Sequence, residues 1–234
     1  MTPHHSGVKP RGMELRLWTL AGSASASILL SAGLSHADLT GEYGGGDIEV
    51  AEPTRRGGFT LGLSGNYGTG SFSGYRNKLQ EIGRPEYQTE VAGNFYSGGS
   101  LWLGSAVTDW LTFGFGLTGG SSTDSGNTAA GGALVVHIES FPLFSLGGAY
   151  EDFGLLTEFG GGSVRIVDEN DDAVAEGGSM STVNVGVFWQ PWQWWHLSFG
   201  PSATYSYMSS PTLSAHTVGL GFRTTFYATS HDAK

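Results

Sequence analysis

Leu111-Thr112-Phe113-Gly114-Phe115-Gly116-Leu117-Thr118 is the stretch of sequence that decides the fold. Its odd-numbered positions are large and apolar, and its even-numbered positions are Thr or Gly. Because side chains on a strand point alternately to opposite faces, this stretch is predicted to be a strand with one apolar face and one small, polar face. Strands that turn bulk toward lipid and small polar groups toward a lumen are the units of transmembrane β-barrels.

The same alternation recurs along the chain, and it predicts about eight strands in an all-β, closed antiparallel transmembrane barrel with meander order. The expected strands are residues 59–67, 98–107, 111–118, 129–138, 144–159, 183–189, 195–207 and 217–226. In the fifth, the alternation changes parity near Glu151 to Gly154, which we interpret as a one-residue bulge within a strand that begins at Phe144. A turn at that point, with more than eight strands, is the alternative.

Composition excludes several classes of protein. The chain has 234 residues, 39 of them Gly, and only 14 % are charged, against about 25 % in an average domain. It contains no Cys, so disulfides, thiolate metal sites and Cys nucleophiles are excluded. Its formal net charge of −10 disfavours nucleic acid as a partner.

The N-terminus has the pattern of an export signal. Lys9, Arg11 and Arg16 precede an uncharged stretch of small and apolar residues, and Ser35-His36-Ala37 resembles a cleavage site. A membrane anchor helix is the alternative, but it needs about 20 strongly apolar residues. We expect a signal peptide at 1–37, a flexible periplasmic arm at 38–57, the barrel at 58–228 and a short tail at 229–234.

Connection lengths and tryptophans suggest how the barrel is oriented. The short connections are expected near 108–109, 139–143 and 190–194, and the long ones near 71–97, 119–128, 165–179 and 208–215. Small outer-membrane barrels have short periplasmic turns, so both termini are expected on the periplasmic side. Five tryptophans at the short turns are expected to form a membrane-interface belt: Trp110, Trp189, Trp192, Trp194 and Trp195. No Lys or Arg is expected on the lipid-facing side. The alternative to a membrane barrel is a soluble sandwich with these aromatic residues in its core.

The lumen of an eight-stranded barrel is just wide enough for side chains to fill it. Its polar candidates are Arg223, His137, His196 and Glu158. Because a buried charge needs a partner, we expect Arg223 to pair with a lumenal carboxylate and suggest Glu158. These residues are interpreted as a packed interior network. A narrow polar path or a small-ligand cavity is the functional alternative.

Two other groups of residues are candidate sites. The acidic run Asp168-Glu169-Asn170-Asp171-Asp172 is interpreted as a solvated loop, with a hard-cation site that bridges to lipopolysaccharide as the alternative. Ser214 and His216 could serve a hydrolase, but the chain has no Gly-x-Ser-x-Gly elbow. We therefore assign no catalytic residue, metal or cofactor, and we do not expect an enzyme.

Over residues 58–227 the chain resembles the small eight-stranded outer-membrane barrels of Gram-negative bacteria, the OmpX, OmpW and OmpA membrane-domain type. The resemblance rests on the export signal, the strand count, the aromatic belts and turns such as Val107-Thr108-Asp109-Trp110-Leu111. The final strand, 217–227, is similar to the strand that the barrel-assembly machinery recognises, although the chain continues to Lys234.

The resemblance implies an integral outer-membrane location, with the lipid bilayer, lipopolysaccharide and the barrel-assembly machinery as partners. The implied role is structural, surface-interacting or narrow porin-like transport. The alternatives are an outer-membrane lipid-modifying enzyme and an exported soluble β-barrel that binds a small apolar ligand. The sequence leaves the subfamily and the oligomeric state open.

Overall fold

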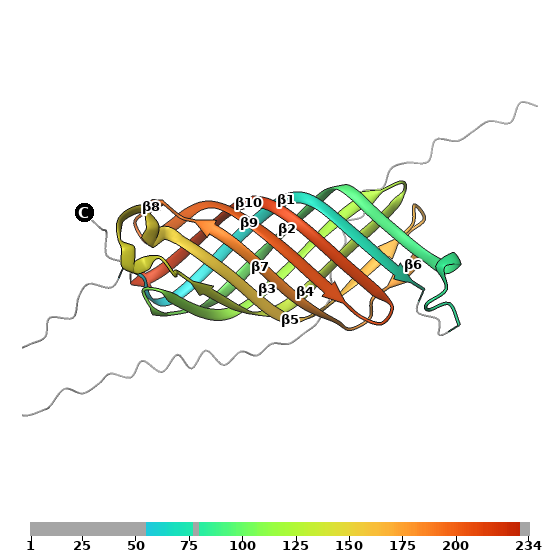
Figure 1. The fold of residues 1–234 in the computed structure, drawn as a ribbon, viewed down its shortest axis with the longest axis horizontal. Coiled ribbons are helices and arrows are strands. Elements are labelled where there is room, and N and C mark those ends of the chain that lie inside the picture. Colours follow the sequence, from blue (N-terminus) through green and yellow to red (C-terminus); the bar gives the residue numbers. More distant parts are fainter. Residues whose placement is uncertain (1–54, 77–79, 230–234) are drawn as a thin grey trace, which may run out of the picture. The chain divides into compact units, whose positions relative to one another are not determined.

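Residues 55–76 and 80–229 are described by a computed structural model, and they form a closed antiparallel barrel (Figure 1). The eight barrel strands are β1 (Gly57–Tyr75), β2 (Gln88–Thr108), β3 (Leu111–Asp124), β4 (Asn127–Ser140), β5 (Phe153–Val167), β7 (Met180–Trp189), β9 (Leu197–Ser209) and β10 (Leu213–Thr229). Each pairs with its neighbours in the chain, and β10 closes the sheet by pairing with β1. The expected eight-stranded meander is confirmed. The signal peptide, most of the arm and all but the first residue of the tail lie outside the described residues.

Short elements lie at the two ends of the barrel. We call the end where Gly57 pairs with Thr229 the terminal end, and the opposite one the distal end. The terminal end carries β8 (Trp192–Trp194) and the 3-10 turns η2 (Phe144–Leu146) and η3 (Gly148–Asp152), and the distal end carries β6 (Ala173–Glu176) and η1 (Pro85–Tyr87) (Figure 1). In the described part of the chain, no helix has the length and apolar character needed to cross a bilayer.

The two faces of the strands follow the predicted alternation. On β3, Phe113, Phe115 and Leu117 point outward and are 43 %, 54 % and 60 % exposed, whereas Thr112 is fully buried. On β7 the outward residues are Val183, Val185, Val187 and Trp189. The barrel is thus apolar outside and polar inside along these strands, the reverse of a soluble protein.

The prediction for the fifth strand was wrong in its first half. Residues 144–152 form η2 and η3 instead of extended chain, and β5 begins at Phe153. Gly147 and Gly148 take positive φ angles of 71° and 62°, which break an extended chain and which other residues rarely adopt. The change of parity therefore marks a turn, not a bulge, and the count stays at eight because β5 runs on to Val167.

The strands are longer than expected, and the expected difference in loop length between the two ends is not found. β1 has 19 residues and β2 has 21. The distal connections are 76–87, 125–126, 168–179 and 210–212, and the terminal ones are 109–110, 141–152 and 190–196. Sequence alternation missed the beginning of β2 because the pairing of β1 with β2 shifts by one residue between Gly68 and Gly70, which reverses the faces there.

Candidate functional site: the lumenal polar network

Five polar side chains meet inside the barrel because they share the inward parity of four strands. They are His137 and Glu139 on β4, Glu158 on β5, Asn184 on β7 and Arg223 on β10. None is more than 5 % exposed. The register pairs His137 with Glu158 across β4 and β5, and Glu158 with Asn184 across β5 and β7. Closure of the sheet through β10 then brings Arg223 to the same level.

The side chains form one continuous chain of contacts. Arg223 donates from Nη2 to Oε1 of Glu139. The same Oε1 lies 2.9 Å from Nε2 of His137, and Nδ1 of His137 lies 2.6 Å from Oε1 of Glu158. Asn184 donates from Nδ2 to the other oxygen of Glu158 at 2.7 Å. The expected ion pair of Arg223 with Glu158 is therefore corrected: its partner is Glu139, and Glu158 is joined to it through His137.

The protons in this network can be counted from its geometry. A neutral imidazole carries one N–H, yet carboxylate oxygens face both ring nitrogens of His137. The two contacts are both hydrogen bonds only when one further proton is present, on the ring or on a carboxyl group. With the proton on the ring, His137 and Arg223 balance Glu139 and Glu158, so that the buried group is neutral as a whole.

Aromatic rings close the lumen around the network. Trp102 stacks on His137 with centroids 4.2 Å apart, and the guanidinium of Arg223 lies 3.9 Å from the ring centroid of Phe188. Trp102 fits because its neighbour on β1 is Gly62, where a Cβ atom would lie 2.1 Å from the indole. Together these groups occupy the lumen at this level, as expected for a barrel whose width is just enough for side chains to fill it.

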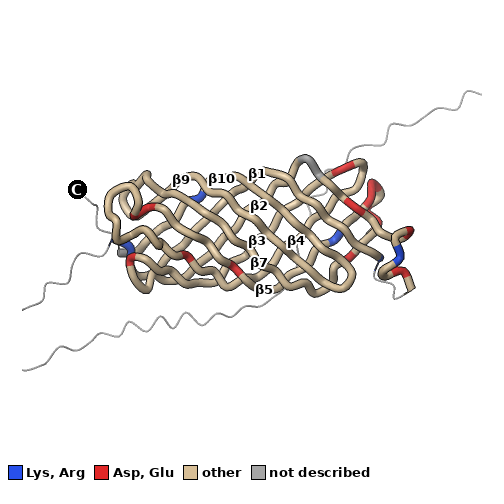
Figure 2. The backbone as a smooth tube through the Cα atoms, viewed as in Figure 1, with Lys and Arg blue, Asp and Glu red and all other residues tan. Residues whose placement is uncertain are grey.

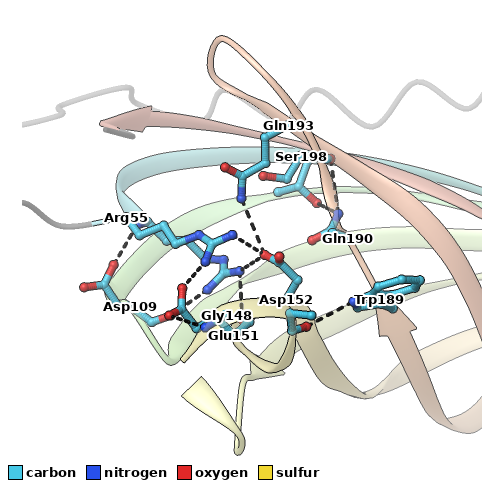
Figure 3. A network of polar contacts seen from close by, with 12 residues as sticks. Arg55, Asp109, Gly148, Glu151, Asp152, Trp189, Gln190, Gln193 and Ser198 are labelled. Atoms are coloured by element: carbon cyan, nitrogen blue, oxygen red, sulfur yellow. Dashed lines mark hydrogen bonds and ion pairs between the residues drawn. The ribbon is translucent and has the colours of Figure 1, made fainter. Parts of the chain in front are cut away.

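A second network, which sequence analysis missed, closes the terminal end (Figure 3). Arg56 is 2 % exposed and donates from Nη2 to Asp152 at 2.9 Å and to the carbonyl oxygen of Glu151 at 3.0 Å. Its backbone N–H donates to Asp109 at 2.6 Å. Arg55 pairs with both Glu151 and Asp152. Residues 55–57, placed by the sequence in the flexible arm, are thus part of the barrel.

Burial controls the electrostatics of this second network. It raises the pKa of the Asp152 carboxyl above its ordinary value, and the charges of Arg55 and Arg56 oppose that rise. Burial also lowers the pKa of Arg56, although an arginine stays charged in proteins. The guanidinium of Arg56 lies 3.8 Å from the ring centroid of Phe141, which covers it. The sequence does contain a signal for this site. Arg55 and Arg56 come directly before the first strand, and Asp109 and Asp152 lie in turns at the same end of the barrel.

The remaining candidate residues lie apart from the network. His196 lies just before β9, with its ring 5.7 Å from Phe226 and 4.5 Å from Trp195. The five tryptophans assigned to a belt are 41–72 % exposed at the terminal end: Trp110, Trp189, Trp192, Trp194 and Trp195.

The acidic loop satisfies itself. Oδ1 of Asp168 accepts from the backbone N–H groups of Asn170 and Asp172 at 2.8 and 3.0 Å, the pattern of an Asx turn. Within residues 55–76 and 80–229, no three His, Asp or Glu side chains are grouped so that they could hold a metal ion. The hydrogen bonds of Asp168 therefore account for the shape of this loop.

The fold and the site define a class: a small, closed, eight-stranded barrel with an apolar exterior and a blocked polar lumen. No protein-family model matches the chain, and no curated protein matches it in sequence. Three similar solved structures are small outer-membrane barrels. Ail, the attachment invasion locus protein of Yersinia pestis, is 10 % identical over 71 % of this chain and 98 % of its own, with a TM-score of 0.46.

Two further solved structures match a similar share of this chain. Neisserial surface protein A is 8 % identical over 70 % of this chain and 95 % of its own, with a TM-score of 0.46. The N-terminal β-barrel domain of Pseudomonas aeruginosa OprF is 14 % identical over 73 % of this chain and all of its own, with a TM-score of 0.40. The strand pairing of this chain itself defines the fold. The subfamily stays unassigned.

Proposed function

We propose that this protein is an integral outer-membrane barrel whose role is structural or surface-interacting, not that of an open pore. The observation that carries the proposal is the reversal of polarity in the barrel wall. Among the described residues, thirty large hydrophobic side chains are exposed, whereas charged and amide groups are buried within. Exposing that area to water would be very unfavourable, at about 25 cal/mol per Å², and hydrocarbon is the solvent that suits it.

The closed lumen argues against transport. The network of Arg223 and Glu139 fills the middle of the barrel, and that of Arg56 and Asp152 fills the terminal end. The polar cavity beside Glu158 and Asn184 has a volume of about 30 Å³, which is enough to hold water. A solute of any size would have to break a buried ion pair to pass.

The two alternative functions find less support. Ser214 and His216 have the same outward parity on β10, and Nδ1 of His216 bonds the hydroxyl of Tyr205 at 2.8 Å instead of a carboxylate. That arrangement does not activate a serine. A soluble barrel that carries a small apolar ligand needs an apolar interior of ligand size, whereas the middle of this lumen is polar and filled.

Outer-membrane fractionation with a heat-modifiability gel tests the proposal. The mature protein is expected in the outer-membrane fraction, soluble only with detergent, and its folded form is expected to migrate differently before and after boiling. A monomer that stays soluble without detergent would refute the proposal. Phe115→Arg on the outer face is the control, because a cation in the hydrocarbon costs about 2–4 kcal/mol and is expected to lower the yield of folded protein in the membrane.

A further inference from the structure

Strands β1 and β2 are about twice as long as a membrane requires. A tilted transmembrane strand needs about 9–11 residues, yet β1 has 19 and β2 has 21. At roughly 3.3 Å per residue and a tilt of about 40°, the segment of β1 from Tyr67 to Tyr75 rises about 20 Å. The barrel therefore includes a distal section that the bilayer does not need.

The polarity of β1 reverses where this section begins. From Phe59 to Tyr67 the outward residues are large and apolar except for Gly65, and those beyond are Thr69, Ser71 and Ser73 before Tyr75 ends the strand. The inward side chains change in the opposite sense. Thr60 and Asn66 are buried in the lower part, whereas Phe72 is buried in the upper part.

Strands β5 and β3 repeat the reversal. On β5 the outward residues change from Leu155 and Phe159 to Ser163 and Arg165. On β3, Leu117 is followed outward by Ser121 and Thr123. The inward residues of this section form one buried apolar cluster, the distal core: Phe72, Val91, Ala129, Val164, Ile166, Ala175, Met180, Leu213 and Ala215.

A bulge in β2 keeps that strand in step with the rest. Below the bulge Leu101 and Leu103 point outward and Trp102 inward, and above it Val91 is fully buried. Without the one-residue shift, Val91 would face outward and leave the distal core. The bulge thus serves the same reversal of polarity that β1, β3 and β5 achieve by composition alone.

We infer that the distal section, which comprises the barrel beyond Tyr67 and Phe95, projects from the bilayer as a rigid, water-exposed barrel with a core of its own. The inference rests on the proposed membrane location. The distal core closes the lumen from outside, and the surface offered to the aqueous side is the outer wall rich in Ser and Thr. Figure 2 shows charged residues gathered at both ends of the barrel, with only a few on the strands between them. Arg165, on the outer face where no Lys or Arg was expected, belongs to this section and pairs with Glu176 of β6.

Single-cysteine labelling tests the inference, and the absence of natural Cys makes the background clean. Ser71→Cys and Ser163→Cys report on the distal wall, and Leu103→Cys and Leu117→Cys report on the apolar wall. Each variant is reconstituted in phospholipid vesicles and treated with N-ethylmaleimide on both sides of the bilayer. A thiol in hydrocarbon does not ionise and does not react, so the reagent distinguishes water from lipid.

The expected result is fast labelling of Ser71→Cys and Ser163→Cys, and at least tenfold slower labelling of Leu103→Cys and Leu117→Cys until the protein is unfolded. Slow labelling at all four positions would overturn the inference and leave the membrane location intact. Fast labelling at all four would instead refute the membrane location itself. A heat-modifiability gel on each variant confirms that the labelled barrel is folded.

Discussion

Arg223 and Arg165 each pair with a glutamate, but in opposite surroundings. The pair of Arg223 with Glu139 is at most 4 % exposed, and that of Arg165 with Glu176, at 3.5 Å, is about half exposed. An exposed pair contributes about 0–1 kcal/mol. Removal of one partner from a buried pair leaves an uncompensated charge and costs about 3–5 kcal/mol.

We therefore expect Arg223→Met to lower the free energy of unfolding by about 3–5 kcal/mol, and Arg165→Met by less than about 1 kcal/mol. Urea unfolding in detergent micelles, followed by the folded band on a gel, measures both. Equal effects of the two substitutions would contradict the assignment of Arg223 to a buried network.

Arg56 and Arg55 share Asp152 but differ in burial, at 1 % and 16 % side-chain exposure. Arg56→Ala is expected to be the more destabilising of the two, by about 2 kcal/mol. It also removes the hydrogen bond from Nη1 of Arg56 to the carbonyl oxygen of Asp109 and the contact of the guanidinium with Phe141. Arg55→Ala leaves Asp152 paired with Arg56 and serves as the matched control. The same urea titration applies, and a larger loss for Arg55→Ala would sink the idea that Arg56 seals the terminal end.

At the scale of an element, β1 carries two glycines with opposite requirements. A Cβ atom at Gly62 would lie 2.1 Å from the Trp102 ring, whereas a Cβ atom at Gly65 would have nothing within 4 Å. Gly62 faces the lumen and Gly65 faces outward on the same strand. Packing against Trp102 therefore requires glycine at position 62, whereas no contact requires it at position 65.

Gly62→Ala is accordingly expected to cost about 1–3 kcal/mol, because Trp102 must leave its stack on His137 or the strands must separate. Gly65→Ala is expected to be neutral or slightly stabilising. Tryptophan fluorescence together with the urea midpoint distinguishes the two. If both variants behave as the wild type, Trp102 does not fill the lumen as described.

At the scale of the whole molecule, the lumen is closed at three levels. These are the terminal network around Arg56, the middle network around Arg223 and the distal core around Ile166. The three closures have different chemistry, and no single substitution removes more than one of them.

The barrel is therefore expected to be silent in planar lipid bilayers, and Arg223→Ala is expected to be silent as well. A known wide porin in the same membrane is the positive control. Steady channels from the wild type, or channels opened by Arg223→Ala alone, would show that the other two levels do not close the path.

The sequence by itself determined the architecture. Alternation with period two is a local property, so the strand count, the faces of the strands and the tryptophans at the terminal end could be read from neighbouring residues. Glu158, His137 and Arg223 were placed inside for the same reason. Alternation failed where a local break has two meanings, as at Gly147 and Gly148, where a turn and a bulge leave the same trace.

Only the tertiary structure decided which of those residues meet. Arg223 and Glu139 are 84 residues apart, and Arg56 and Asp152 are 96 apart, so each pair depends on the register around the whole closed sheet. The bulge in β2 and the apolar filling of the distal section likewise appear only when all eight strands are aligned. Register is set by the sum of many weak cross-strand contacts, and no short stretch of sequence contains that sum.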